Sequence, residues 1–69
     1  MEKIESIDGF LSYCKEKRNL KLLGLYNKLK NPTTPRIDKL LIISSIILSL
    51  RKKGVQVNTN FVNQLLEFV

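Results

Sequence analysis

The sequence of 69 residues predicts a small all-α protein, a three- to four-helix bundle packed around one central apolar helix at about residues 35–53. Three observations predict this fold. Apolar residues recur at the spacing of helix faces. Two prolines and a glycine bound the most apolar segment, and that segment is apolar almost all round, as in helices that other elements surround. A chain of this length forms one domain, residues 1–69, and buries only about 60% of its unfolded surface.

The first helix is expected at about residues 6–18. Ser6 is a suitable N-cap, because its hydroxyl can accept a hydrogen bond from a backbone N–H of the first turn. The acidic residues before it would allow the helix to begin as early as Glu2. One apolar face then follows at positions i, i+3, i+4 and i+7, formed by Ile7, Phe10, Leu11 and Cys14.

The second helix is expected at about residues 19–30, with Asn19 as its N-cap. Gly24 lies in its middle, where glycine costs about 1 kcal/mol relative to alanine. We interpret Gly24 as a position that another part of the backbone approaches closely. The main apolar face consists of Leu22, Leu25, Tyr26 and Leu29.

Two prolines within residues 31–35 separate the second helix from the third, which is expected at about residues 35–53. Thr34 is the expected N-cap, because a residue before proline favours extended backbone, and Pro35 suits the first helical position. Gly54 ends the helix after three basic residues.

Three serines interrupt this apolar helix. Ser45 and Ser49 share a polar strip and are expected to face solvent. Ser44 instead lies between Leu41 and Leu48 on an apolar side. A small side chain leaves room for a neighbouring helix, so we interpret Ser44 as a close-packing position.

Residues 55–57 are expected to be extended, with no obvious partner strand, and a fourth helix follows at about residues 58–69 with Asn58 as N-cap. The four helices together predict a core. Its expected members are Ile7, Phe10, Leu11, Cys14, Leu22, Leu25, Tyr26, Leu29, Leu40, Ile43, Ile47, Leu48, Phe61, Leu65 and Leu66.

Residue types argue against catalysis. The chain has no histidine and one cysteine, and its three glycines are scattered singly, so it lacks the sets used for nucleophilic catalysis, zinc binding or phosphate loops. We therefore expect no catalytic, cofactor-binding or metal-binding residues and no small-molecule substrate. Cys14 is interpreted as a small buried hydrophobe. A single free cysteine and the lack of a secretory signal predict a cytoplasmic, intracellular protein.

The apolar segment at residues 40–50 is too short for a membrane span, since its eleven residues cover about 16 Å against a hydrocarbon core of about 30 Å. Three short helices would cover about two thirds of the central helix. The uncovered remainder is expected around Ile42, Ile46 and Leu50. This pattern predicts a non-enzymatic protein–protein interaction module that self-associates as a homo-oligomer or binds a partner helix.

The net charge of +6 supports an alternative. The protein would be an accessory or regulatory protein that binds nucleic acid through a basic face. Charges that complement helix dipoles are the structural explanation of the same residues, and peripheral attachment to an anionic membrane is a third hypothesis. The candidate basic residues are Lys15, Lys17, Arg18, Lys21, Lys28, Arg51, Lys52 and Lys53.

Overall fold

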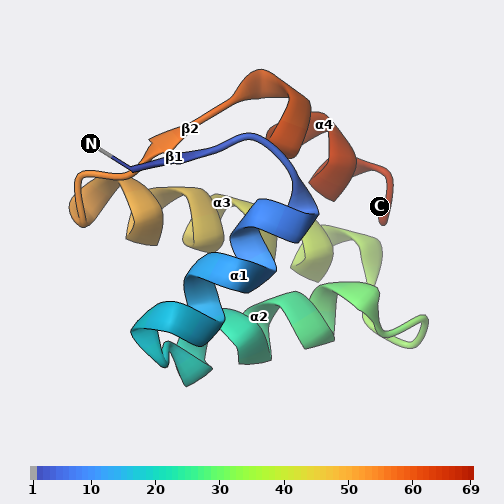
Figure 1. Ribbon diagram of the computed structural model, residues 1–69. Coiled ribbons are helices and arrows are strands. Elements are labelled where there is room, and N and C mark those ends of the chain that lie inside the picture. The colour runs from blue at the N-terminus through green and yellow to red at the C-terminus, as the bar shows by residue number, and fades with distance from the viewer. Residues whose placement is uncertain (1) are drawn as a thin grey trace.

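The computed structural model describes residues 2–69 and contains four helices and two short strands (Figure 1). The helix bounds differ from the expected ranges by at most one residue, except that the last helix ends at Leu66. The elements in chain order are β1 (Lys3–Ile4), α1 (Ile7–Lys17), α2 (Leu20–Lys30), α3 (Arg36–Lys52), β2 (Gln56–Val57) and α4 (Thr59–Leu66).

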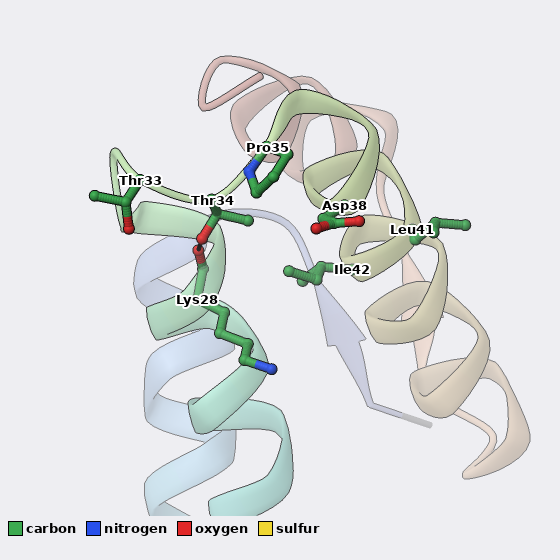
Figure 2. Close-up of a pocket in the computed structure, with 7 residues that line it drawn as sticks. All are labelled: Lys28, Thr33, Thr34, Pro35, Asp38, Leu41 and Ile42. Carbon is green, nitrogen blue, oxygen red and sulfur yellow. Dashed lines mark hydrogen bonds between the residues drawn. The ribbon is translucent and has the colours of Figure 1, made fainter.

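Three of the four helices begin at the N-caps that the sequence predicts. Backbone N–H groups of the first turns donate to the side-chain oxygens of Ser6, Asn19 and Asn58. The prediction of Thr34 as a cap is wrong, because Pro35 is the N-cap of α3 and no side chain caps this helix. The Thr34 hydroxyl instead donates to the carbonyl of Lys28 at 2.8 Å and closes the turn between α2 and α3 (Figure 2).

The fold departs from the all-α prediction at the start of the chain. β1 and β2 form a parallel pair in which Lys3 lies opposite Gln56 and Ile4 opposite Val57. The first helix therefore does not extend back to Glu2, because the carbonyl of that residue accepts the N–H of Gln56 at 2.9 Å. The extended segment after α3 has a partner strand from the other end of the sequence.

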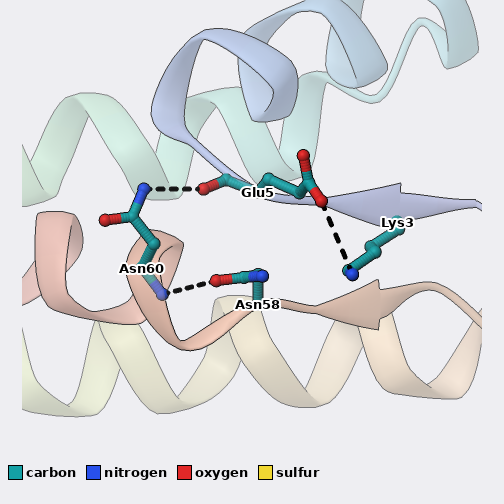
Figure 3. Close-up of polar contacts among 4 residues, drawn as sticks. All are labelled: Lys3, Glu5, Asn58 and Asn60. Carbon is teal, nitrogen blue, oxygen red and sulfur yellow. Dashed lines mark hydrogen bonds and ion pairs between the residues drawn. The ribbon is translucent and has the colours of Figure 1, made fainter.

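Side-chain hydrogen bonds extend this connection from the strands to α4. The Asn60 side chain donates to the Glu5 carbonyl at 3.1 Å, and the Ile7 N–H donates to Oε1 of Gln64 at 2.8 Å. Figure 3 shows Asn60 between the Glu5 carbonyl and the Asn58 cap. The beginning of the chain and its last helix thus form one hydrogen-bonded unit.

The core is a single cluster of buried side chains to which every helix and β1 contribute. Phe10 lies at its centre, with ring centroids 5.3 Å from Phe61 and 5.8 Å from Tyr26. The buried residues are Ile4, Phe10, Tyr13, Cys14, Leu22, Tyr26, Leu29, Ile42, Ile43, Ile46, Leu50, Val55, Phe61 and Leu65. Eight of the fifteen predicted core residues are buried. Four are partly buried against this core, namely Ile7, Leu11, Leu25 and Ile47, and the prediction is wrong for Leu40, Leu48 and Leu66, which are exposed.

α3 forms one wall of the molecule rather than its centre. It contacts α2, α4 and β2, and one stripe of its side chains faces the core. This stripe contains Ile42, Ile46 and Leu50, so the prediction that these three residues form a partner surface is wrong. Both sides of the helix are apolar. The pattern of apolar residues therefore does not specify which side the rest of the chain will cover.

Gly24 does not have the close neighbour within the chain that we inferred from the sequence. A Cβ atom at this position would meet no other part of the described chain within 4 Å. Gly24 is exposed on α2, and nothing in the structure explains why a glycine stands there.

The burial of α3 predicts opposite effects for two positions on the same helix. Ile46→Ala should lower the free energy of unfolding by about 2–5 kcal/mol, because it leaves a cavity in the core. Leu48→Ala, at a position that is 60% exposed, should change it by less than about 0.5 kcal/mol. Urea denaturation followed by circular dichroism measures both values.

Ile46→Val, with an expected loss of about 1 kcal/mol, keeps the measurement accessible if the alanine variant is unfolded. An equal loss of unfolding free energy for alanine at positions 46 and 48 would contradict this orientation of α3.

Candidate interaction surface

The side of α3 opposite the core is an exposed apolar surface. Ile37, Leu41, Ser44 and Leu48 follow one another at i, i+4, i+7 and i+11, so they share one stripe of the helix. Ile37 is 69% exposed and Leu41 is 63% exposed, while Leu40 borders the stripe. We call this surface the α3 outer face and define it by Ile37, Leu40, Leu41, Ser44 and Leu48.

One hollow between α2 and α3 borders the first half of this face (Figure 2). Asp38 and Ile42 point into the hollow, and Leu41 lines its edge with a side chain directed toward the outer side of α3. Lys28 of α2 and the turn that contains Thr34 complete its lining. The first half of the outer face therefore has an acidic group on the flank that faces α2.

A second hollow between the same helices borders the other half of the face. Leu48 of α3 and Leu25 of α2 contribute its apolar lining, and its charges come from Lys21, Arg51 and Lys52. Asp38 and Lys52 thus lie on the same flank of α3, at opposite ends of the helix. Another basic residue of the helix, Lys39, lies away from this flank, because its amine donates to the Phe68 carbonyl at 2.9 Å.

Several predicted basic residues meet at one end of the molecule, where α2 begins and α3 ends. Lys21, Lys52 and Lys53 line one hollow there, and Lys17 and Lys53 line another. Arg51 lines the neighbouring hollow with Lys21 and Lys52. We call this group the basic end and define it by Lys17, Lys21, Arg51, Lys52 and Lys53.

The remaining predicted basic residues have different positions. Lys28 lines the first hollow, as Asp38 does, and lies two turns along α2 from Lys21. Lys15 and Arg18 are exposed at the end of α1. Lys17 forms an ion pair with Glu2 at 3.1 Å, and this hydrogen bond to the carboxylate raises the pKa of Lys17. The basic end therefore carries an acidic neighbour as well as its five cations.

Sequence reasoning missed Ile37 and Leu41 as members of an exposed surface, although the signal was present. Ser44 was interpreted as a close-packing position between Leu41 and Leu48, and the structure places all three on the outer face. Ser45 is exposed as expected, and Ser49 is partly buried. Ser44 therefore faces solvent, and no neighbour among residues 2–69 explains its small size.

The described residues 2–69 contain no cluster of three or more histidine, cysteine, aspartate or glutamate side chains arranged to hold a metal ion. None of their helices has the length and apolar character needed to cross a membrane. Comparison with known protein families, curated proteins and solved structures yields no match.

Cys14 is fully buried, and burial raises the pKa of its thiol. Both effects slow the reaction with Ellman's reagent, because the thiolate is the reactive form and the reagent cannot reach it. We expect native Cys14 at pH 8 to react about 100-fold or more slowly than in urea. Absorbance at 412 nm measures the rate.

A matched control places the thiol at an exposed position of the same helix. The variant Cys14→Ala with Ser12→Cys should react rapidly in the native state, because Ser12 is exposed. Equal native rates for the two thiols would contradict the burial of Cys14.

Proposed function

We propose that this chain is a non-enzymatic protein–protein interaction module and that the α3 outer face is its docking surface. The observation that carries the proposal is the set of three aliphatic side chains, Ile37, Leu41 and Leu48, each at least 60% exposed along one helix of a 69-residue protein. Contiguous apolar surface of this kind on a small protein usually marks an interaction site. The lone buried cysteine suits the reducing conditions of the cytoplasm, where we place this function.

The spacing of the outer face supports a helix as its partner. A ridge at i, i+4, i+7 and i+11 fits the groove between the side-chain rows of another helix. Ser44 lowers the centre of that ridge and allows the two helix axes to approach. Full burial of a leucine side chain stabilises a complex by about 1.5–3 kcal/mol, so Leu41 and Leu48 supply most of the expected affinity.

A display library of amphipathic helical peptides tests this proposal without knowledge of the natural partner. Selected peptides should bind the variant Leu41→Ser/Leu48→Ser about 100-fold more weakly than the unaltered chain, because two buried leucine contacts are lost. Titration of labelled peptide, followed by fluorescence anisotropy, measures the affinities.

Leu20→Ser is the matched control, since Leu20 is 78% exposed but lies outside the outer face. It should leave affinity unchanged within about twofold. Circular dichroism confirms that each variant is folded. If every selected peptide binds the double variant and the unaltered chain equally, the outer face is not the docking surface.

The basic end favours a second candidate function, the binding of nucleic acid. Lys21, Lys52 and Lys53 line one hollow at the junction of α2 and α3, so their charges add at one place on the surface. Contacts of this kind to phosphate groups give an affinity that is independent of sequence and falls steeply with salt. The ion pair between Lys17 and Glu2 reduces the charge available there.

Fluorescence anisotropy with a labelled DNA duplex between 50 and 200 mM salt tests this second candidate. The variant Lys21→Ala/Lys53→Ala should reduce the slope of log affinity against log salt by about two, because two phosphate contacts are removed. Lys28→Ala/Lys30→Ala removes the same charge outside the basic end and should have less effect. Equal losses for the two variants, or no binding at 50 mM salt, would exclude a phosphate site at the basic end.

A further inference from the structure

We propose that the occupant of the α3 outer face is a second copy of this chain, with the two α3 helices antiparallel about a two-fold axis that passes between Ser44 and Ser45. This inference rests on the proposed function, because it names the partner of the same surface. It is carried by the order of residues along the outer face and by the positions of the charges on its flank.

The order of residues along the outer face is self-complementary. A two-fold interface pairs each position with the one equally far from the axis on the other copy. The third position before Ser44 is Leu41, and the third position after Ser45 is Leu48. Leu41 of each copy therefore lies opposite Leu48 of the second copy, and two equivalent leucine pairs flank the axis.

Two small exposed side chains of α3 lie at the axis. Ser44 and Ser45 are both exposed, and the distance between packed helices, about 8–10 Å, depends on the side chains at their closest contact. Hydroxyl groups there allow the axes to approach, so that the leucine pairs on either side come into contact. This arrangement gives Ser44 the close neighbour that it lacks within one chain.

The charges select the antiparallel orientation. A two-fold axis perpendicular to the helices keeps each flank of one helix beside the same flank of the other, with its ends exchanged. Asp38 and Lys52 occupy one flank at opposite ends, so Asp38 of each copy lies near Lys52 of the second copy. In a parallel pair the two-fold axis runs along the helices and places the matching flanks on opposite sides of the interface, so Asp38 and Lys52 would not meet each other there.

Asp38 is available for such a contact. Among residues 2–69 the ion pairs join Lys3 to Glu5 and Lys17 to Glu2, and Asp38 takes part in neither. The net charge of +6 on each copy opposes association at long range, but ions at physiological strength screen charges beyond about 8 Å. The local pairs between Asp38 and Lys52 therefore act in favour of this orientation.

Sedimentation velocity of the full chain over a range of concentrations, in 150 mM salt, tests the proposal. We expect a reversible monomer–dimer equilibrium. Asp38→Lys and Lys52→Glu should each weaken the dimer about tenfold, because two attractive pairs become repulsive. The double variant Asp38→Lys/Lys52→Glu exchanges the charges and should restore dimerisation to within about threefold.

Glu16→Lys is the matched control, because it makes the same charge change as Asp38→Lys at an exposed position of α1. It should leave the dimer unchanged. Circular dichroism of each variant separates a loss of dimer from a loss of fold.

Engineered thiols test the orientation independently. Ser44→Cys should be joined to its own mate in the second copy by a short bismaleimide, because both thiols lie beside the axis. Ile37→Cys should not be joined, since in an antiparallel pair the two positions lie near opposite ends, about 20 Å apart. A parallel dimer would cross-link both variants and would overturn the proposed orientation.

The outcomes separate this inference from the proposed function. A chain that is monomeric at every concentration overturns the self-association. The docking surface still stands in that case if peptides bind in a manner that depends on Leu41 and Leu48. A dimer that is insensitive to both the charge changes and Leu41→Ser/Leu48→Ser uses another surface. A complex of two chains that appears only with added DNA duplex would assign the pairing to nucleic acid instead.

Discussion

The fold depends on one constraint, which is that this chain has too few residues to cover both sides of its longest helix. α3 is apolar on both sides, yet within residues 2–69 its main contacts are with α2, α4 and β2. Ile46 is therefore completely buried, whereas Leu48, two residues along the chain, is 60% exposed. Small proteins bury a small share of their surface, and here that limit leaves one side of α3 free for contact with another molecule.

The parallel strand pair decides which side of α3 is covered. Strands of two residues have no independent stability, so the pair persists because Ile4 and Val55 are buried in the core and because the Ile7 N–H donates to Gln64. These contacts hold the segment before α1 against the segment that joins α3 to α4. The end of α3 is thereby fixed relative to α1 and α4, and the stripe that contains Leu50 is turned inward.

Local signals predicted the helices, because caps, prolines and periodic apolar faces act within a few residues. Ser6, Asn19 and Asn58 cap helices as their side chains predicted. The β pair was not predictable in this way, because its two strands lie more than fifty residues apart and neither is long enough to show an alternating pattern.

Local sequence patterns also could not predict which side of α3 faces the core. For this reason the prediction that Ile42, Ile46 and Leu50 form the interface was wrong. Only the position of Ser44 carried information about the free side. A small polar residue on an apolar stripe is costly in a core without a partner for its hydroxyl, but it suits a surface that closes against a neighbouring helix.

The two candidate functions make competing demands on one residue. Lys52 belongs to the basic end and also to the flank where a second copy would place Asp38.

In the antiparallel pair the two basic ends would be separated by about the length of α3, 17 residues or about 26 Å. Duplex DNA presents successive major-groove half-sites about 34 Å apart on one face, so this pair does not match a repressor-like dimer that reads two half-sites. Each basic end would have to contact phosphates independently, with its charge reduced by the Lys52 that the interface uses. Self-association and tight binding of nucleic acid would therefore oppose each other in this chain, and the exposed leucines are the reason why we propose self-association.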